Sequence, residues 1–302
     1  MKILSFIITN LCNMNCAFCL RGKDKASIDL KLMKRILEEA KTLGYDTIAL
    51  TGGEAFMHPK FKELIDLIVK EGFDFTIVSN AKNYEKYIPA LKTGKLKIIT
   101  FSLDGKPQTH DSWRGKGSYD KVIEAIKYFS GKTFVIAAMC INKYNMNEIS
   151  DVLFAAEKAG AKQLNYSSVI PTGENDPFVL SDREREECLK LVNSLKSRTK
   201  LKIVTLSALR TLDKVEFCRA LDLSSMTVNP HGKLTFCCDT TGNGAILGDL
   251  KKQKLSKLIV KGMKLSNFLK QKKHEQLTKG KTFPGCDTCW FCNKFLEKYK
   301  EK

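Results

Sequence analysis

Short β-prone runs alternate with segments of helical periodicity through the first two thirds of the chain, and this alternation restricts the possible folds more than any other feature. In one such segment Met33, Ile36, Leu37 and Ala40 fall on one helical face, opposite a face rich in lysine and glutamate. The predicted strands are residues 3–9, 47–51, 73–79, 97–103, 133–141 and 163–169. The predicted helices between them are residues 30–43, 61–71, 84–91, 119–129 and 146–159.

This order of elements predicts an α/β protein whose strands pair in parallel through right-handed crossovers, as a partial (β/α)6 barrel. Ligand sites of such sheets lie at the carboxyl ends of the strands. A helix over residues 182–196, a possible strand over 201–206 and a β-hairpin over 225–237 follow, and the hairpin turns at His231-Gly232. Because the pattern changes near residue 207, we predict the barrel over residues 1–207 and a small α+β domain over 208–302.

The length and composition of the chain indicate an ordinary packed protein. Its 302 residues suffice for a barrel-sized domain with a small companion, and 43% of them are hydrophobic and 28% charged. No apolar run approaches the ~18 residues that span a bilayer. The apolar opening, residues 1–9, is too short for a signal peptide and runs directly into a group of cysteines. These features predict a cytoplasmic protein with no membrane partner.

The formal net charge of +18 comes mostly from lysines spread along the whole chain. A nucleic acid partner, an acidic peptide substrate and a plain solvated surface would each account for this charge. Arginine, the better reader of bases and phosphates, is scarce, and no nucleic-acid-binding motif accompanies the charge. We therefore favour the solvated surface, expect no nucleic acid partner and expect a monomer.

The eleven cysteines are grouped instead of evenly spread. Three lie between residues 12 and 19, three between 286 and 292, and two are adjacent at 237 and 238. Such grouping is typical of a metal or cluster site, whose ligands converge on one small object, and not of disulfides in a chain of this length. Cys140, in a predicted strand, and Cys188, on a predicted helix, are interpreted as small apolar core residues.

The strongest functional motif is Cys12-x3-Cys16-x2-Cys19, directly after the first predicted strand. Three thiolates from one loop can hold three irons of a cubane and leave the fourth iron open to a ligand. With the aromatic Phe18 before the last cysteine, the motif resembles the signature of the radical S-adenosylmethionine (SAM) superfamily. The resemblance implies a [4Fe–4S] cluster that binds and cleaves SAM, a 5′-deoxyadenosyl radical that abstracts a substrate hydrogen, and Phe18 near the adenine. A structural zinc loop is the alternative.

A second motif, Thr51-Gly52-Gly53-Glu54, ends the second predicted strand. Two glycines let the backbone approach a ligand closely, and the carboxylate can bind an ammonium group. The segment resembles the Gly-Gly-Glu motif of the same family, which implies that Gly52, Gly53 and Glu54 bind the amino group of SAM. Asn80, which ends the third predicted strand, resembles a residue of the family's cofactor pocket.

The fourth predicted strand ends at Ser102-Leu103-Asp104-Gly105. This segment resembles the ribose contact of the family, which implies that Ser102 and Asp104 bind ribose hydroxyls, and a capped turn is the alternative. The next residues, 110–115, resemble the His-Asp-x-x-Arg segment of the peptide-modifying branch. There Arg114 would meet the carboxylate of SAM, with a surface ion pair as the alternative. The four histidines lack a paired spacing for a metal, so none is given a catalytic role.

A second cysteine set lies in the C-terminal third: Cys218, Cys237, Cys238, Cys286, Cys289 and Cys292. Its opening, a cysteine, thirteen residues, a glycine, four residues and a cysteine, resembles that of the SPASM and twitch domains. The short terminal series resembles the twitch version, which implies one auxiliary [4Fe–4S] cluster. Its ligands would be Cys218, Cys237, Cys286 and Cys289, with Cys292 and Cys238 left open. A zinc ion held by four cysteines is the alternative.

Cys238 is a candidate catalytic residue. Adjacent residues on a strand point to opposite faces, so Cys238 would point away from a cluster that Cys237 binds. A thiol there would give a hydrogen atom to a substrate radical, as in the peptide epimerases that this chain resembles. A buried core residue is the alternative.

The resemblance covers both halves of the chain and implies a maturase of a ribosomally made peptide, which epimerises a residue or forms a crosslink. An electron donor such as flavodoxin or ferredoxin would be its partner beside the peptide. A twitch-type dehydrogenase of a small alcohol or aminosugar is the alternative. A non-catalytic iron–sulfur electron carrier is a third possibility, but it needs closed clusters and has no use for the Gly-Gly-Glu segment.

Overall fold

The computed structural model describes residues 2–21, 24–170, 176–206, 209, 211–212, 222–223, 226–236, 246–279 and 283–284. Strands and helices alternate over its first two thirds. The strands are β1 (Ile3–Ile7), β2 (Thr47–Thr51), β3 (Asp74–Ser79), β4 (Leu96–Ser102), β5 (Phe134–Ile141), β6 (Gln163–Ser168) and β7 (Lys202–Thr205). The α-helices are α1 (Leu30–Thr42), α2 (Phe61–Lys70), α3 (Ile88–Leu91), α4 (Pro107–Arg114), α5 (Ser118–Phe129), α6 (Ile149–Ala159) and α7 (Asp182–Leu195). Short 3-10 helices are η1 (Ala55–Met57), η2 (Tyr84–Tyr87), η3 (Met146–Glu148) and η4 (Lys196–Arg198).

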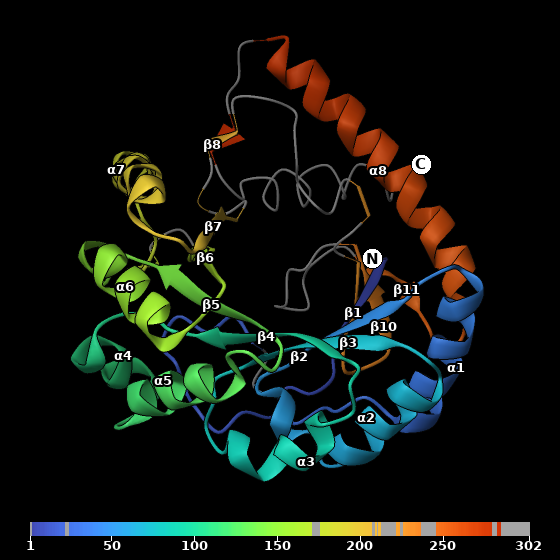
Figure 1. Ribbon diagram of the computed structural model, residues 1–302. Helices are drawn as coiled ribbons and strands as arrows, with labels where there is room; N and C mark the ends of the chain where they lie inside the picture. Colours follow the sequence, from blue (N-terminus) through green and yellow to red (C-terminus); the bar gives the residue numbers. More distant parts are fainter. Residues whose placement is uncertain are drawn as a thin grey trace.

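Strands β1 to β7 pair in the order of the sequence, and every one of these pairs is parallel. The sheet is strongly curved, and α1, α2, α3, α5 and α6 cover its outer side (Figure 1). Because the carboxyl ends of parallel strands share one edge, the loops that follow β1 to β5 gather there. The prediction of an α/β protein with a partial barrel is confirmed.

The C-terminal third extends the same sheet beyond β1. Its strands are β9 (Thr227–Val228), β10 (Lys233–Thr235) and β11 (Ile246–Asp249). β9 pairs in parallel with β1, and β10 is antiparallel to both β9 and β11, so that the sheet has ten strands. The predicted hairpin is therefore present, and its turn places Gly232 at φ +80°, a conformation that favours glycine. The domain boundary near residue 207 stays a prediction. Strands β9 to β11, which come after residue 207, belong to the same sheet as β1 to β7, which come before it.

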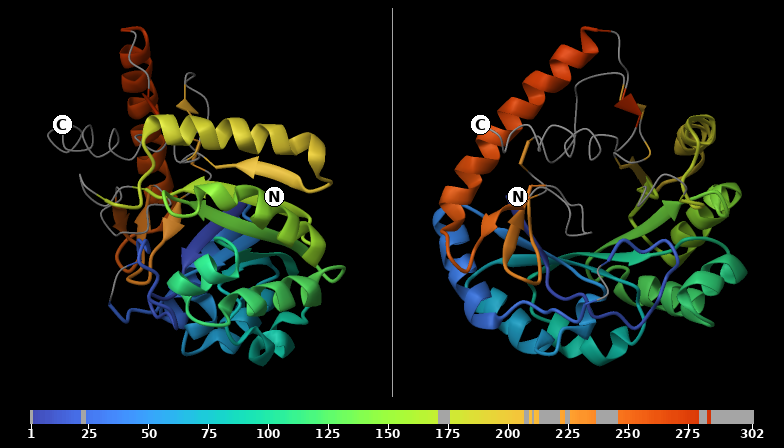
Figure 2. Two further views of the ribbon diagram at one scale, coloured as in Figure 1. Left: turned by 90° about the vertical axis from the view of Figure 1, so that its left-hand side faces the viewer. Right: turned by 180° about the vertical axis from the view of Figure 1, so that it is seen from behind.

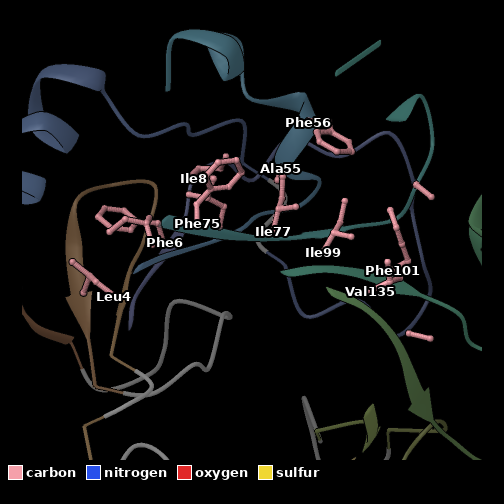
Figure 3. Packing of buried hydrophobic residues seen from close by; sticks show 14 of the residues in the cluster. Leu4, Phe6, Ile8, Ala55, Phe56, Phe75, Ile77, Ile99, Phe101 and Val135 are labelled. Carbon is pink, nitrogen blue, oxygen red and sulfur yellow. The ribbon is translucent and has the colours of Figure 1, made fainter. Parts of the chain in front are cut away.

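The hydrophobic core lies between the curved sheet and the outer helices. Leu4, Phe6, Phe75, Ile77 and Phe101 are each at most 1% exposed. Figure 3 shows these strand side chains beside Ala55 and Phe56 of η1. Each large side chain buried there contributes about 1.5–3 kcal/mol relative to an exposed one, so the strands are held in place chiefly by this layer.

Helix α1 shows how the sequence positions one outer helix. The Asp29 carboxylate accepts the backbone N–H groups of Lys31 (2.9 Å) and Leu32 (3.0 Å), which starts the helix. Its predicted apolar face is buried: Met33, Ile36, Leu37 and Ala40 are at most 1% exposed. A cap and a single apolar face thus fix both where the helix begins and which side meets the sheet.

Two helices differ from the prediction for reasons visible in the sequence. The predicted helix over residues 84–91 is the 3-10 turn η2 followed by the short α3, because Pro89 cannot donate a backbone hydrogen bond within a continuous helix. Helix α4 was not predicted, although Pro107 at its first position and Gly115 just after its end are typical helix boundaries. The four-residue strand β11 was not predicted either.

The longest helix of the described residues, α8 (Leu255–Leu277), is rich in lysine and contacts α1 and β11. Figure 2 shows it rising along the edge of the open side of the sheet. Strands β8 (Thr211–Leu212) and β12 (Phe283–Pro284) form a separate antiparallel pair. Within the described ranges, no helix has both the length and the apolar character needed to cross a membrane.

Candidate functional site

A cavity of about 830 Å³ lies at the carboxyl ends of β1 to β5. Its wall contains all but one of the barrel residues predicted to bind the cluster or SAM: Cys12, Cys16, Phe18, Cys19, Gly52, Gly53, Glu54, Asn80, Ser102 and Arg114. The remaining one, Asp104, is 1% exposed and lies behind the wall, against Arg114. The sequence placed these residues at strand ends, and the curvature of the sheet brings them around one space.

The cysteine loop, residues 10–21, leaves β1 and is closed at its base by one backbone and one side-chain hydrogen bond. Asn10 N–H donates to the Ala26 carbonyl at 2.8 Å, and the hydroxyls of Thr9 and Ser27 are 2.7 Å apart. Within the loop, Cys19 N–H donates to the Cys16 carbonyl at 3.1 Å, which forms a tight turn between these two ligand candidates. A short closed loop of this kind presents its three thiols to the same cavity.

The thiols of the loop fit a polynuclear cluster. Burial raises the pKa of Cys12 and of Cys16, and charge on Cys19 raises both further, while Arg114 lowers them. Three thiolates so close to one another need positive charge at their centre, which an iron cluster supplies. Among the described residues, no three Cys, His, Asp or Glu side chains converge on a single-ion site. The ligands of a cubane cluster do not have to meet at a single ion, since each thiolate binds its own iron.

The glycine turn, residues 51–54, is packed against the cysteine loop. Gly53 N–H donates to the Thr9 carbonyl (2.7 Å) and Glu54 N–H to the Leu11 carbonyl (2.8 Å). A Cβ atom on Gly53 would lie 2.5 Å from the Leu11 carbonyl oxygen, closer than atoms can approach. The glycines therefore allow the backbone of the cysteine loop to pack directly against this turn. They also line the cavity.

Glu54 is the buried carboxylate of the site, with only 2% of its surface exposed. Its oxygens accept the backbone N–H groups of Asn80 (2.7 Å) and Phe56 (3.2 Å). Burial nevertheless raises the pKa of Glu54 to about 7. A buried carboxylate with so high a pKa is stabilised by a cationic partner, and the ammonium group of SAM is such a partner. The acceptor oxygens of Glu54 therefore fit the amino end of that cofactor.

Asn80 joins the glycine turn to the cysteine loop. Its backbone N–H binds Glu54, while its side-chain amide donates to the Asn13 side chain at 2.8 Å and lies 3.9 Å from the Cys12 sulfur. The amide oxygen accepts the Lys82 backbone N–H at 2.9 Å. Asn80 thus fixes the position of a ligand candidate relative to the buried carboxylate.

Arg114, a residue of the cavity wall, forms a buried ion pair with Asp104 behind it. Arg114 Nε donates to Asp104 Oδ2 at 2.5 Å, and the two side chains are 12% and 1% exposed. The other carboxylate oxygen of Asp104 accepts the Cys140 backbone N–H at 2.8 Å. Both oxygens thus accept hydrogen bonds within the protein. Of this predicted pair, Ser102 lines the cavity and Asp104 does not.

The His-Asp-x-x-Arg segment has a distinct contact at each of its three characteristic positions. His110, fully buried, accepts the Asp104 backbone N–H at Nδ1 (3.1 Å). Asp111 accepts the N–H groups of Gly117 (2.6 Å) and Tyr119 (2.8 Å) and so caps helix α5. Arg114 reaches back to Asp104 from the end of α4. The segment therefore organises one end of the cavity wall.

Phe18 is held by aromatic neighbours from helix α4 and from the segment that precedes α7. Its ring meets Trp113 of α4 edge-on at 5.3 Å between centroids and Phe178 at 5.9 Å, and Phe178 in turn meets Tyr144 at 5.5 Å. Such edge-to-face contacts stabilise each pair beyond their burial. The ring of Phe18 is thereby fixed at the cavity wall.

Cys140 is a wall residue that the sequence analysis assigned to the core. It lies on β5, lines the cavity, and burial raises the pKa of its thiol to about 12. Apolar residues occur on both faces of β5, so the pattern of apolar and polar residues along this strand could not indicate which face borders the cavity. Cys188, by contrast, is 2% exposed among core residues of α7, as predicted. The six C-terminal cysteines, Cys218, Cys237, Cys238, Cys286, Cys289 and Cys292, lie outside the described residues.

Comparisons with known proteins identify the family of the chain. Residues 6–156 match the radical SAM superfamily, and residues 218–293 match an iron–sulfur cluster-binding domain, SPASM. The chain is 32% identical over 196 residues to the antilisterial bacteriocin subtilosin biosynthesis protein AlbA of Bacillus subtilis (strain 168), which covers 62% of this chain and 44% of AlbA. It is 29% identical over 191 residues to the sporulation killing factor maturation protein SkfB of the same strain, covering 61% and 47%. The aligned part thus spans less than half the length of either relative.

Solved structures show the same fold. Streptococcus suis SuiB bound to its precursor peptide SuiA matches with a TM-score of 0.71 and 17% identity, over 86% of this chain and 64% of SuiB. Native anSMEcpe with bound AdoMet and the Kp18Cys peptide matches with a TM-score of 0.68 and 15% identity, over 87% of this chain and 83% of anSMEcpe. At such identities the likeness concerns the fold alone. The two family matches identify the cofactors as SAM, a [4Fe–4S] cluster and an auxiliary iron–sulfur cluster. The chain belongs to the radical SAM superfamily.

Proposed function

We propose that this chain is a radical SAM enzyme that modifies a ribosomally made peptide, by epimerising a residue or forming a crosslink. The observation that carries the proposal is the single cavity in which the three-cysteine loop, the buried Glu54 and Arg114 meet. When bound, the cluster and SAM supply a 5′-deoxyadenosyl radical that removes a hydrogen atom from the substrate. The described residues position the cofactor and shape the space beside it.

Each wall residue has a proposed contact. Cys12, Cys16 and Cys19 would hold three irons of the cluster, which would leave one iron available to SAM. Glu54 binds the amino group, and Arg114 the carboxylate, of the methionine part. Phe18 contacts the adenine, and Ser102 the ribose. Asp104 was expected at the ribose as well, but it lies behind the cavity wall against Arg114, so we assign it the task of holding Arg114.

The relatives favour a peptide substrate. AlbA and SkfB are named for the biosynthesis of a bacteriocin and the maturation of a killing factor, and the SuiB structure contains a precursor peptide. The cavity of about 830 Å³ lies in the upper part of the ~300–1,000 Å³ range of ligand pockets, which is sufficient for a cofactor-sized ligand. An electron donor such as flavodoxin or ferredoxin completes the proposed reaction.

The first test removes the initiating cluster. We expect Cys12→Ala/Cys16→Ala/Cys19→Ala to abolish reductive formation of 5′-deoxyadenosine. Its iron content should fall from about eight to about four per chain, because the auxiliary cluster remains. Cys188→Ala is the matched control, since this cysteine is buried in the core of α7. It should keep both iron content and SAM cleavage. Persistent 5′-deoxyadenosine formation in the triple variant would refute the proposal.

The second test identifies the reaction. The reconstituted enzyme is reduced with SAM in deuterated water, and candidate peptides and aminoalcohols are followed by mass. A gain of one deuterium at carbon indicates epimerisation, and a loss of two hydrogens indicates crosslinking or oxidation. Turnover of the aminoalcohols but of no peptide would support a small-molecule dehydrogenase instead.

The role of Cys238 as hydrogen donor remains part of the proposal. Cys238→Ala should still cleave SAM and abstract hydrogen, but it should not give the inverted product. The iron content should stay unchanged. A loss of about four irons in this variant would make Cys238 a cluster ligand instead, and unchanged product would remove the donor role.

A further inference from the structure

Asp104 is held by the protein at every polar atom. Its backbone N–H donates to His110 Nδ1 (3.1 Å), and its backbone carbonyl accepts from the Asn145 side-chain amide (2.8 Å). Its side-chain oxygens accept from the Cys140 N–H (2.8 Å) and from Arg114 Nε (2.5 Å). His110, Asn145 and Asp104 are all at most 1% exposed. These four hydrogen bonds hold the Asp104 carboxylate in a single position.

This position determines where the Arg114 guanidinium lies. Asp104 binds Arg114 through Nε, at the inner edge of the guanidinium. The two terminal nitrogens form no hydrogen bond or ion pair with any described residue, and Arg114 lines the cavity. Because guanidinium groups are planar and bind carboxylates with a fixed geometry, a carboxylate that holds Nε also sets the direction of the remaining N–H groups.

We propose that His110 and Asn145 are positioning residues, which hold Asp104 so that Arg114 directs its terminal N–H groups toward the carboxylate of SAM. Neither His110 nor Asn145 is among the described residues that line the cavity. His110 acts through the Asp104 backbone N–H, and Asn145 ties the Asp104 carbonyl to the carbonyl of Cys140 (3.0 Å) across the ends of β4 and β5. The inference rests on the SAM site of the proposed function.

The chemistry of His110 suits this task. Since Nδ1 accepts a backbone N–H, the neutral ring carries its proton on Nε2. Burial lowers the pKa of His110 to about 4, so that the accepting form is kept at neutral pH. Asparagine offers a side-chain oxygen near the position of Nδ1, whereas leucine fills a similar volume without an acceptor. These two substitutions therefore separate the hydrogen bond from the packing.

The experiment measures affinity instead of turnover. The cluster-loaded protein is titrated with SAM and with decarboxylated SAM, which keeps the amino group, the sulfonium and the adenosine but lacks the carboxylate. We expect His110→Leu and Asn145→Leu to weaken SAM binding about tenfold, with the affinity for decarboxylated SAM unchanged within about twofold. His110→Asn should recover SAM affinity to within about threefold of the wild type.

His58 provides the matched control. It is also buried and also accepts a backbone N–H, that of Lys60, at Nδ1 (3.1 Å), but it lies beside the glycine turn. His58→Leu should therefore leave the ratio of the two affinities unchanged. Equal weakening of both ligands in His110→Leu, or full SAM affinity in it, would overturn the inference. If His110→Leu does not fold, Asn145→Leu and His110→Asn carry the same test. A wild type that binds neither ligand would refute the proposed function instead.

Discussion

Two walls of the cavity are built by opposite means. The glycine turn, residues 51–54, is held by backbone hydrogen bonds to the cysteine loop, with no space for a Cβ atom at Gly53. The ion-pair segment, residues 104–114, is held by side chains, through the Asp104–Arg114 pair and the His110 ring. The first wall therefore depends on shape, and the second on charge and hydrogen-bonding groups.

The difference teaches what each wall tolerates. Close backbone packing excludes any added atom, whatever its charge. A buried ion pair accepts changes of volume more readily than the loss of one charge, because the remaining charge is left in a medium of low dielectric constant. The four substitutions below test this contrast.

The largest effect is expected for the ion pair. Asp104→Asn leaves the Arg114 charge without its counter-ion, and we expect the free energy of unfolding to fall by about 3–5 kcal/mol in urea titrations. Combining it with Arg114→Gln should recover part of the loss, because no unpaired charge remains.

Asp74→Asn is the control. The pairs that Asp74 forms with Lys95 and Lys97, both at 3.4 Å, are partly exposed, so this substitution should cost less than about 1 kcal/mol. Strictly additive effects in the double variant would contradict the coupling.

Gly53→Ala tests the wall that depends on shape. Its Cβ would meet the carbonyl oxygens of Leu11 (2.5 Å) and Asn10 (2.6 Å), both backbone atoms that cannot rotate away. We expect a loss of about 2–3 kcal/mol in unfolding free energy and a lower iron content, because the cysteine loop must move. Gly44→Ala, at φ +76° with nothing within 4 Å of the new Cβ, should cost about 1 kcal/mol for its left-handed backbone and keep its iron. Full iron content in Gly53→Ala would show that the loop tolerates displacement.

His110 gives the charge-dependent wall a pH dependence. Burial lowers its pKa from 6.5 to about 4, and Asp104, Arg114 and Asp111 are the charged groups nearby. Between these values the unfolded chain binds a proton that the folded protein does not, so stability present above pH 6.5 is lost as the pH falls. We expect the wild type to lose about 2 kcal/mol more than His110→Asn between pH 7 and pH 5 in paired urea titrations. Glu54, whose pKa is raised, contributes equally to both proteins.

The smallest effect is expected at Asp111, which belongs to the same segment but only caps helix α5. Asp111→Ala should lower the unfolding free energy by about 1 kcal/mol and leave SAM affinity unchanged. Asp29→Ala removes a comparable cap from α1 and should cost a similar amount. A large loss of SAM affinity in Asp111→Ala would place this residue in the binding wall as well.

The sequence by itself determined the order of strands and helices, because the periodicity of apolar residues reports which element can bury a face against a sheet. It also indicated the cofactor, because the compact motif formed by Cys12, Cys16 and Cys19 resembles the radical SAM signature and lies on one short loop. Gly52, Gly53 and Glu54 were found in the same way, as a compact motif at a strand end.

Only the tertiary structure decided what the motif residues touch. Thr9 and Leu11 meet the glycine turn across β1 and β2, and Asp104 meets both Arg114 and the backbone of β5. Cys140 became a wall residue, and β9 to β11 joined the edge of the barrel sheet beside β1. The physical reason is the same in each case: these contacts join residues far apart in the chain, and their partners are fixed by the curvature and register of the sheet, which local sequence does not encode.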